Sequence, residues 1–382
     1  MTAFARTDTS LMGRWWWTVD RWLLFSLAVL IGFGLLLTIG ASVAVAERLG
    51  LDSFHFAERQ MAFLAVALVS MFGISLASVK TIRRIAVVLF PVCLLLMALA
   101  SAIGPEIKGA QRWLPLGPFT LQPSEFMKPA FIVVSAWMFA EQDRDRSFPG
   151  WKIATALYLL VVTILMFQPD FGQTALVTVV WLTQFFLAGL PMIWVAVVVA
   201  VSIIAIIGAY NLLPHVASRI DRFLDPSSGD TYQVDTALNA FRSGGLFGRG
   251  PGEGLVKRVL PDSHTDFIFA VAGEEFGTLV CIGLVALFAV IVVRVLLNLL
   301  KEQDYFVFLA TAGLVTLFGL QAFINIGVNL ALLPAKGMTL PFVSYGGSSL
   351  MAISITMGMV LAMTRCNAPG ARGASLARRA AW

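Results

Sequence analysis

The chain has 382 residues, of which 58% are hydrophobic and only 13% are charged, and its mean hydropathy is +0.84. Soluble domains average about 45–50% apolar and about 25% charged residues, so this composition excludes a soluble globular protein. The formal net charge of +5 does not call for a nucleic-acid partner, because basic loops on the cytoplasmic side of a membrane protein account for most of it.

Apolar segments long enough to span a membrane recur along the chain, and a window of about 19 residues predicts about ten of them. We expect an all-α polytopic membrane protein in which residues 1–382 form a single membrane domain. The predicted spans are Ser26–Val45, Ala62–Ala77, Ile85–Ala102, Phe126–Phe139, Ala154–Phe167, Leu176–Leu187, Trp194–Leu212, Phe267–Leu287, Phe306–Ile326 and Leu350–Met363.

Three of these segments need interpretation. The apolar run Ala175–Leu213 is too long for one helix, and Gly-Leu-Pro at 189–191 divides it, because proline removes a backbone donor. The run Phe267–Leu300 is also long, so we expect its helix to extend beyond the bilayer at its basic end. Ala-Val-Ala at 44–46 resembles a signal-peptide cleavage site, but the apolar region before it exceeds the usual length of about 7–15 residues. The first span is therefore predicted to be an uncleaved anchor.

The positive charges predict the orientation. An even number of spans places both termini on one side, and short loops rich in Lys and Arg face the cytoplasm. Residues 1–21 and 366–382 are therefore predicted to be cytoplasmic, and the long loop 214–265, between the seventh and eighth spans, is predicted to lie outside. The basic residues on the cytoplasmic side are Arg6, Arg14, Arg21, Lys80, Arg83, Arg84, Arg144, Arg146, Lys152, Arg294, Lys301, Arg365, Arg372, Arg378 and Arg379.

Three polar inserts fall on the predicted outer side. They are residues 104–128, 214–265 and 329–349. Long loops of this kind are more often functional than idle. Because polar chemistry is concentrated at one membrane surface, the pattern argues against a channel or a symmetric carrier.

A helix is predicted to begin at Gln-Pro-Ser-Glu, residues 122–125, because proline suits the first turn and glutamate favours the positive end of the helix dipole. Lys128 stands three residues after Glu125, so the two side chains share a helical face. The pair either reduces the cost of burying both charges or faces a substrate, and the two roles are compatible.

The eighth span begins with acidic residues. Asp266 directly follows His264 and Thr265, and it either caps the helix or serves function. Glu274 and Glu275 are neighbours, so they point about 100° apart on a helix. For these two we favour pairing with a cation or polar group on an adjacent helix.

The stretch "SGGLFGRGPGEG" before this span is rich in glycine. It lacks the Gly-Lys-Ser/Thr ending of a nucleotide loop and follows no strand, so we interpret it as a flexible loop around a lipid-side pocket. Basic residues in and beside it suit a phosphorylated head group. They are Arg242, Arg249, Lys257 and Arg258.

Four stretches, taken together, resemble the signature loops of the SEDS family (shape, elongation, division and sporulation) of bacteria. They read "GAQRWLPLGPFTLQPSEFMK", "QPDFGQTAL", "FGRGPGEGLVKRVLPDSHTDFIFAVAGEEFG" and "LPAKGMTLPFVSYGGSS". Their order and the number of spans match the family over nearly the whole chain. Within the family, "LGPF", "GPGEG" with "VKR", and "KGMTLPFVSYGG" are more similar to the division member than to the elongation member.

The resemblance implies a peptidoglycan glycosyltransferase that polymerises lipid II at the outer face of the bacterial inner membrane, for septal wall synthesis during division. It implies that Asp266, the Asp of "HTDF", is catalytic, and that Glu125 and Lys128 form a functionally important pair in a central cavity. It also implies a class B penicillin-binding transpeptidase and other divisome membrane proteins as partners.

Lipid II chemistry agrees with this placement of polar groups. A general base should take the proton of the acceptor sugar's 4-hydroxyl, and Asp266 is the candidate. Growing charge on the departing pyrophosphate needs cations or a divalent metal, Mg or Mn; the sequence identifies no other cofactor. The candidate substrate-binding residues are Glu125, Lys128, Arg112, Lys257, Arg258, His264 and Lys336.

Other functions remain open at this point. A lipid II flippase needs a polar path that reaches both faces, whereas the cytoplasmic loops here are short and mostly basic. An elongation-type polymerase would share the same chemistry. A scaffold that only binds the transpeptidase would leave the charges on the outer side unexplained.

Overall fold

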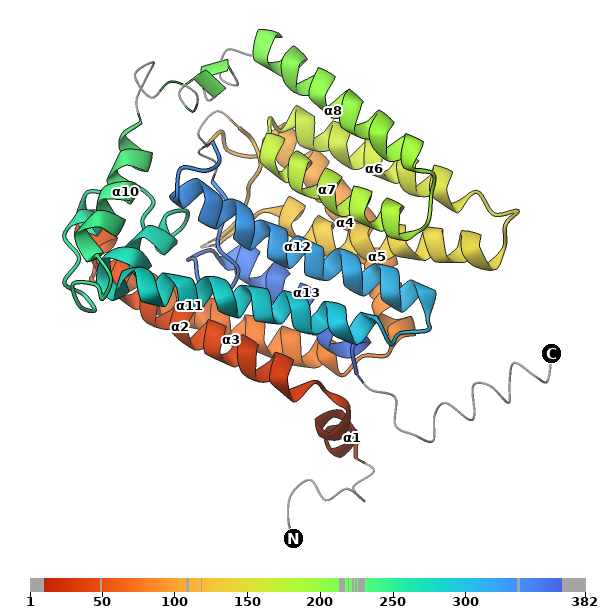
Figure 1. The fold of residues 1–382 in the computed structure, drawn as a ribbon, viewed down its shortest axis with the longest axis horizontal. Helices are drawn as coiled ribbons and strands as arrows, with labels where there is room; N and C mark the ends of the chain where they lie inside the picture. The colour runs from red at the N-terminus through yellow and green to blue at the C-terminus, as the bar shows by residue number, and fades with distance from the viewer. Residues whose placement is uncertain are drawn as a thin grey trace.

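The computed structural model describes residues 10–48, 50–107, 110–117, 119–212, 231–334 and 337–365, with isolated positions between 217 and 225. The chain forms a bundle of long helices with one short hairpin (Figure 1). The helices are α1 Leu11–Thr18, α2 Arg21–Arg48, α3 His55–Ser75, α4 Val79–Ile103, α5 Pro123–Arg144, α6 Gly150–Phe167, α7 Phe171–Leu187, α8 Met192–Leu212, α10 Tyr232–Gly244, the 3₁₀ turn η2 Val256–Arg258, α11 Ile268–Leu299, α12 Tyr305–Asn329 and α13 Gly347–Met363.

Each predicted span falls almost entirely within one of these helices. The helix is interrupted at residues 189–191, which separates α7 from α8 as expected. Among the described residues, six helices are long and apolar enough to cross a membrane: α2, α3, α4, α6, α11 and α12. Two further apolar helices, α7 and α13, are shorter. The fold is therefore that of a multi-pass helical membrane protein, and the number of ten spans remains a prediction.

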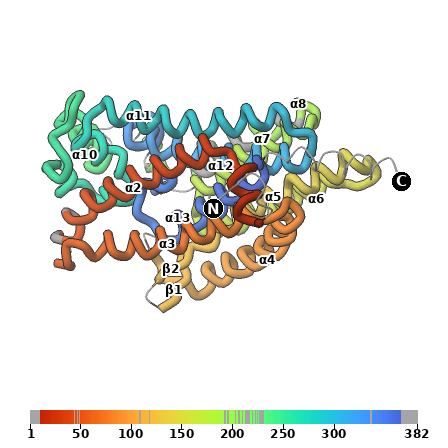
Figure 2. Tube along the Cα trace, turned by 90° about the horizontal axis from the view of Figure 1, so that it is seen from below, coloured from red at the N-terminus to blue at the C-terminus, as the bar shows by residue number. Residues whose placement is uncertain are grey.

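Helices α5, α12 and α13 lie at the centre of the bundle. Side chains of α5 are buried almost without interruption from Pro123 to Phe139, and α12 packs against both α5 and α13. Helices α4, α6 and α7 cover one side, while α2, α3 and α11 cover the other (Figures 1 and 2). The outer helices expose apolar side chains such as Val69 and Leu95, each 72% exposed, as expected of surfaces that face hydrocarbon.

One short hairpin interrupts the helical architecture. Strand β1, Leu114–Leu116, pairs antiparallel with β2, Phe119–Leu121, and Leu114 lies opposite Leu121. Gly117 in the turn has φ +64°, a conformation that glycine adopts at low cost. The hairpin lies beside α3 and α4 (Figure 2) and leads directly into α5, which begins at Pro123 as predicted.

The predicted long loop before the eighth span is partly helical, since it contains α10 and η2. The eighth span itself is not one continuous helix, contrary to our expectation. Gly277 has φ 81° and ψ 175°, so α11 is broken between residues 268–276 and 278–299. This backbone conformation is essentially restricted to glycine, and hydropathy alone gives no sign of it because the apolar run continues through the break.

The glycine-rich loop docks on this break. Four backbone hydrogen bonds join the two segments: from the N–H of Arg249 to the carbonyl of Glu274 at 3.0 Å, from Gly250 to Glu275 at 2.9 Å, from Thr278 to Gly245 at 2.9 Å and from Leu279 to Leu246 at 3.3 Å. A helix interruption leaves such groups without helical partners. The loop therefore supplies the partners that the break removes, which is a structural role for the glycine-rich stretch.

The three polar inserts meet at one end of the bundle, where α10 and its loops gather (Figure 1); their placement on the outer side of the membrane remains a prediction. The N–H of Tyr345 donates to the carbonyl of His264 at 2.8 Å. The hydroxyl of Ser348 accepts from the N–H of Gln122 and donates to the carbonyl of Thr120, each at 3.1 Å. The first turn of α13 and the loop before it are therefore the meeting point of all three inserts.

Candidate active site

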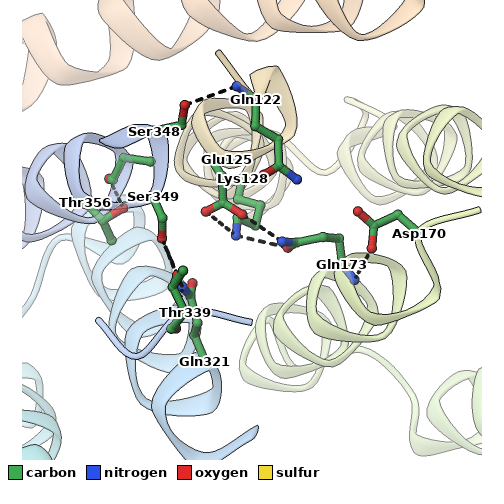
Figure 3. Close-up of polar contacts among 11 residues, drawn as sticks. Gln122, Glu125, Lys128, Asp170, Gln173, Gln321, Thr339, Ser348, Ser349 and Thr356 are labelled. Atoms are coloured by element: carbon green, nitrogen blue, oxygen red, sulfur yellow. Dashed lines mark hydrogen bonds and ion pairs between the residues drawn. The ribbon is translucent and has the colours of Figure 1, made fainter. Parts of the chain in front are cut away.

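A buried polar triad lies near the start of α5 (Figure 3). Lys128 Nζ lies 2.8 Å from Glu125 Oε2 and donates to Gln173 Oε1 at 3.0 Å, while Gln173 Nε2 donates to Glu125 Oε1 at 2.7 Å. The three residues are only 4%, 1% and 6% exposed for Glu125, Lys128 and Gln173. The predicted pairing of Glu125 with Lys128 is confirmed, and Gln173 of α7 closes the triad.

A second ion pair continues this network toward the N-terminal end of α7. Asp170 Oδ1 accepts from the N–H of Gln173 at 3.3 Å, and Asp170 Oδ2 lies 3.4 Å from a terminal nitrogen of Arg112. Arg112 also donates to the carbonyls of Gln168 and Pro169, at 2.8 and 2.5 Å. The positive charges of Lys128 and Arg112 thus balance the negative charges of Glu125 and Asp170. Of these four side chains, that of Arg112 is partly accessible, at 26% exposed.

A group of neutral polar residues lies beside the Glu125–Lys128 pair, on α12, α13 and the loop between them (Figure 3). The hydroxyls of Thr339 and Ser349 are 2.6 Å apart. Gln321 Nε2 donates to the carbonyl and the hydroxyl of Thr339, both at 3.2 Å. The charged triad is therefore flanked by hydroxyl and amide groups suited to hydrogen bonding with a hydroxylated ligand.

Asp266 lies just before α11 and is partly exposed. The helix begins at Ile268 with Phe267 at the N-cap position. Asp266 is therefore not the N-cap residue, which was one of the two roles that the sequence allowed for it. A Cβ atom on Gly337 would lie 2.9 Å from Asp266 Oδ2. The carboxylate of Asp266 therefore lies directly against the backbone of the loop between α12 and α13.

Lys257 is placed differently from a phosphate-binding cation. It is only 4% exposed; its Nζ pairs with the carboxylate of Glu275 and donates to the carbonyl of Gly40 at 3.0 Å. The carboxylate of Glu274 accepts the backbone N–H groups of residues 255, 256 and 257 at 2.7, 2.7 and 2.9 Å. These contacts tie η2 to α2 and α11, so both glutamates and Lys257 serve the fold.

Three predicted substrate-binding residues remain: Arg258, Lys336 and His264. Arg258 is exposed on η2, so its guanidinium is accessible to a ligand. Lys336 lies outside the described residues. His264 lies beside the rings of Phe56 and Tyr345, with centroids 5.0 and 5.3 Å away.

His264 is neutral at physiological pH. Burial lowers the pKa of His264 to about 4; the nearby Arg48 acts in the same direction, and Asp262 opposes them. A neutral imidazole adds no positive charge for a phosphate group. His264, a predicted substrate-binding residue, can therefore contribute a ring contact or a neutral hydrogen bond to a ligand, but no positive charge.

Among the described residues, no three His, Cys, Asp or Glu side chains are placed to hold a metal ion. A divalent cation at the pyrophosphate stays a prediction, because Mg²⁺ is commonly held by one or two carboxylates together with substrate phosphates.

Removing one member of the buried pair should destabilise the protein more than removing both. Glu125→Ala leaves Lys128 as a buried charge with only Gln173 opposite it, and breaking a buried pair in this way typically costs about 3–5 kcal/mol. Glu125→Ala combined with Lys128→Met removes the uncompensated charge and should recover most of that loss. Thermal unfolding of the purified variants in detergent measures the difference, and equal losses in the single and double variants would contradict mutual charge compensation.

The fold and the buried charged network define a multi-pass membrane protein with a polar site at one end of its helix bundle. Residues 21–368 match the model of the FtsW/RodA/SpoVE family, described as "Cell cycle protein", and the chain belongs to this family. The resemblance to the SEDS family, and within it to FtsW, is confirmed.

Two curated relatives carry the name "Probable peptidoglycan glycosyltransferase FtsW". The protein of Caulobacter vibrioides is 49% identical over 374 residues, covering 98% of this chain and 96% of its own. The protein of Aromatoleum aromaticum is 36% identical over 358 residues, covering 90% of this chain and 87% of its own.

Solved structures share the fold. A chain from "Structural coordination of polymerization and crosslinking by a peptidoglycan synthase complex" matches with a TM-score of 0.71 at 28% identity, covering 91% of this chain and 97% of that one. The rod shape determining protein RodA of Thermus thermophilus matches with a TM-score of 0.67 at 28% identity, covering 92% of this chain and 99% of that one.

Proposed function

We propose that this protein is a peptidoglycan glycosyltransferase that polymerises lipid II into glycan strands for septal cell-wall synthesis. The activity follows the curated relatives, of which the Caulobacter protein covers nearly the whole chain. The geometric observation that carries the proposal is that all three polar inserts meet at the first turn of α13 and the loop before it, and that this loop also lies against the carboxylate of Asp266. A substrate with a lipid tail, a pyrophosphate and a sugar needs an apolar surface for the tail and an adjacent polar surface for the pyrophosphate and the sugar.

Asp266 acts as the general base in this proposal. It takes the proton from the acceptor's 4-hydroxyl as that oxygen attacks the anomeric carbon of the donor. The bond from that carbon to the pyrophosphate breaks, and undecaprenyl pyrophosphate leaves. The accessible guanidinium of Arg258, the partly exposed Arg112 and Lys336 are the candidate cations for the pyrophosphate charge.

The Glu125–Lys128–Gln173 triad forms a polar wall for the substrate in this proposal. Because its charges are compensated internally, it adds no net charge to that wall, and the partly exposed hydroxyls of Thr339 and Ser349 beside it offer the hydrogen-bonding atoms. If the Glu125→Ala/Lys128→Met double variant is as stable as the parent protein but inactive, the pair serves the substrate; if it is both stable and active, the pair serves only the fold.

The proposed topology has ten spans, cytoplasmic segments at 1–21 and 366–382, and loop 214–265 outside, in the bacterial inner membrane at the division septum. The six helices that are long and apolar enough to span support it. A topology reporter fused near Ser228 should read as external, and a cytoplasmic reading would overturn both the topology and the placement of Asp266.

A class B penicillin-binding transpeptidase and other divisome membrane proteins are the proposed partners. The similarity to a chain of a peptidoglycan synthase complex supports the first of these.

The decisive experiment is polymerisation of labelled lipid II by the purified protein, with and without that transpeptidase. Glycan strands that form despite penicillin-type inhibitors are the expected product.

Transfer of lipid II between the leaflets of vesicles without any polymer would instead favour the flippase function. Restoration of wall synthesis in cells depleted of the elongation polymerase, but not in cells depleted of the division polymerase, would favour the elongation role.

A further inference from the structure

The segment that carries Asp266 is held by its carbonyl groups. Three consecutive carbonyls, those of residues 264, 265 and 266, each accept hydrogen bonds from the C-terminal part of the chain. The donors are the N–H of Tyr345 at 2.8 Å, the hydroxyl of Ser344 at 2.5 Å, and the side-chain amides of Asn325 and Asn329 at 2.8 and 2.9 Å. The position of Asp266 is therefore set by α12 and the loop that follows it.

Asn325 links Asp266 to the loop that its carboxylate faces. Besides the carbonyl of Asp266, Asn325 Nδ2 donates to the carbonyl of Met338 at 2.6 Å. Met338 directly follows Gly337, whose backbone lies against the Asp266 carboxylate. The side-chain amide of Asn325 therefore fixes both Asp266 and the loop that lies against its carboxylate.

Asn329 fixes the helix that follows Asp266. Its Oδ1 accepts the N–H of Ala270, in the first turn of α11, at 3.1 Å, while its Nδ2 donates to the carbonyls of Asp266 and Asn325 at 2.9 Å each. It thus supplies the capping acceptor that Phe267 does not provide. Being four residues apart, the two asparagines lie on the same face of α12.

Burial shows how unusual this pair is. Asn325 is 1% exposed and Asn329 is fully buried, although both belong to an apolar helix that qualifies as a membrane span. Placing amides in such a helix is costly unless their hydrogen bonds are made. Here the bonds are made to the backbone of Asp266 itself.

We propose that Asn325 and Asn329 are positioning residues for Asp266: they hold its backbone carbonyl so that its carboxylate stays in the geometry that proton transfer needs. The inference rests on the proposed function, in which Asp266 is the general base. Misplacing a reacting group by about 1 Å can reduce a rate about 10²-fold. Neither asparagine needs to touch the substrate for this effect.

A double-mutant cycle tests the inference. Asn325→Ala should lower kcat for lipid II polymerisation about 10–100-fold and change KM little, because the substrate contacts remain. In the Asp266→Asn background the same substitution should have almost no further effect, because there is no base left to misplace. Asn325→Ser, which keeps one small donor, should lose less activity, and it replaces the alanine variant if that variant does not fold.

Gln184→Leu is a matched control. Gln184 is also a fully buried amide in an apolar helix, and it donates to the carbonyls of Ile132 and Leu309 at 2.9 and 3.2 Å, without contact to the Asp266 segment. Its substitution should lower activity by the same factor in both backgrounds, or not at all.

Two outcomes would overturn the inference. One is that the Asn325 variants retain full activity. The other is that they lower activity by the same factor in both backgrounds, which is the pattern of a structural loss unrelated to Asp266. A fully active Asp266→Asn protein would instead refute the general-base role in the proposed function, so the two failures are distinguishable.

Discussion

Asp266→Asn should reduce lipid II polymerisation by about 10²–10⁴-fold, the usual contribution of a general base. The asparagine keeps the shape of the side chain and its capacity for hydrogen bonding, but it cannot accept a proton at neutral pH. Binding of lipid II and expression should survive, since the backbone contacts of residue 266 do not depend on its side chain. Polymerisation and binding of labelled lipid II measure the two effects separately.

Asp262→Asn is the matched control for this substitution. It removes the same charge four residues away, and its positive φ of 51° is a conformation that asparagine tolerates. We expect this variant to stay within a few-fold of the parent protein. Asp266→Glu adds one methylene and should cost about 10²-fold through misplacement. Full activity in Asp266→Asn would exclude Asp266 as the base.

Local patterns in the sequence predicted the parts of the site that depend on local geometry. Glu125 and Lys128 are three residues apart, and the helix start at Pro123 follows from proline's fixed φ, so the spacing alone placed the two side chains on one face. The apolar runs likewise predicted the positions of the long helices, because hydropathy is a property of each segment by itself.

Contacts between distant segments could not be predicted in this way. Gln173 lies 45 residues after Lys128, and Asn325 lies 59 residues after Asp266, so no spacing rule joins them. A signal was nevertheless present: amides within an apolar span are rarely accidental, and both asparagines of α12 deserved notice on that ground. Lys257 shows the opposite error: a basic residue just after a glycine-rich loop suggested a ligand contact, whereas its partner is Glu275 within the fold.

Gly277→Ala should be among the most destabilising single substitutions in the chain. A Cβ at this position would lie 2.4 Å from the nitrogen of Gly248 and 2.4 Å from the carbonyl oxygen of Leu246. Both are backbone atoms of the docked loop, so they cannot move aside as a side chain would. The conformation itself, with φ 81° and ψ 175°, adds about 1–3 kcal/mol of strain for any residue with a side chain.

The loss should spread to the site, because the same loop continues into η2 and the segment that carries Asp266. Displacing the loop would break the four backbone hydrogen bonds that it makes to the two parts of α11, and we expect a total loss of more than about 3 kcal/mol. Gly283→Ala, six residues further along α11, is the control: its Cβ would meet no atom within 4 Å, and in a regular helix alanine is favoured over glycine by up to about 1 kcal/mol. Thermal unfolding in detergent compares the two variants. If Gly277→Ala unfolds at the same temperature as Gly283→Ala, α11 is continuous through residue 277, and the break that receives the glycine-rich loop does not exist.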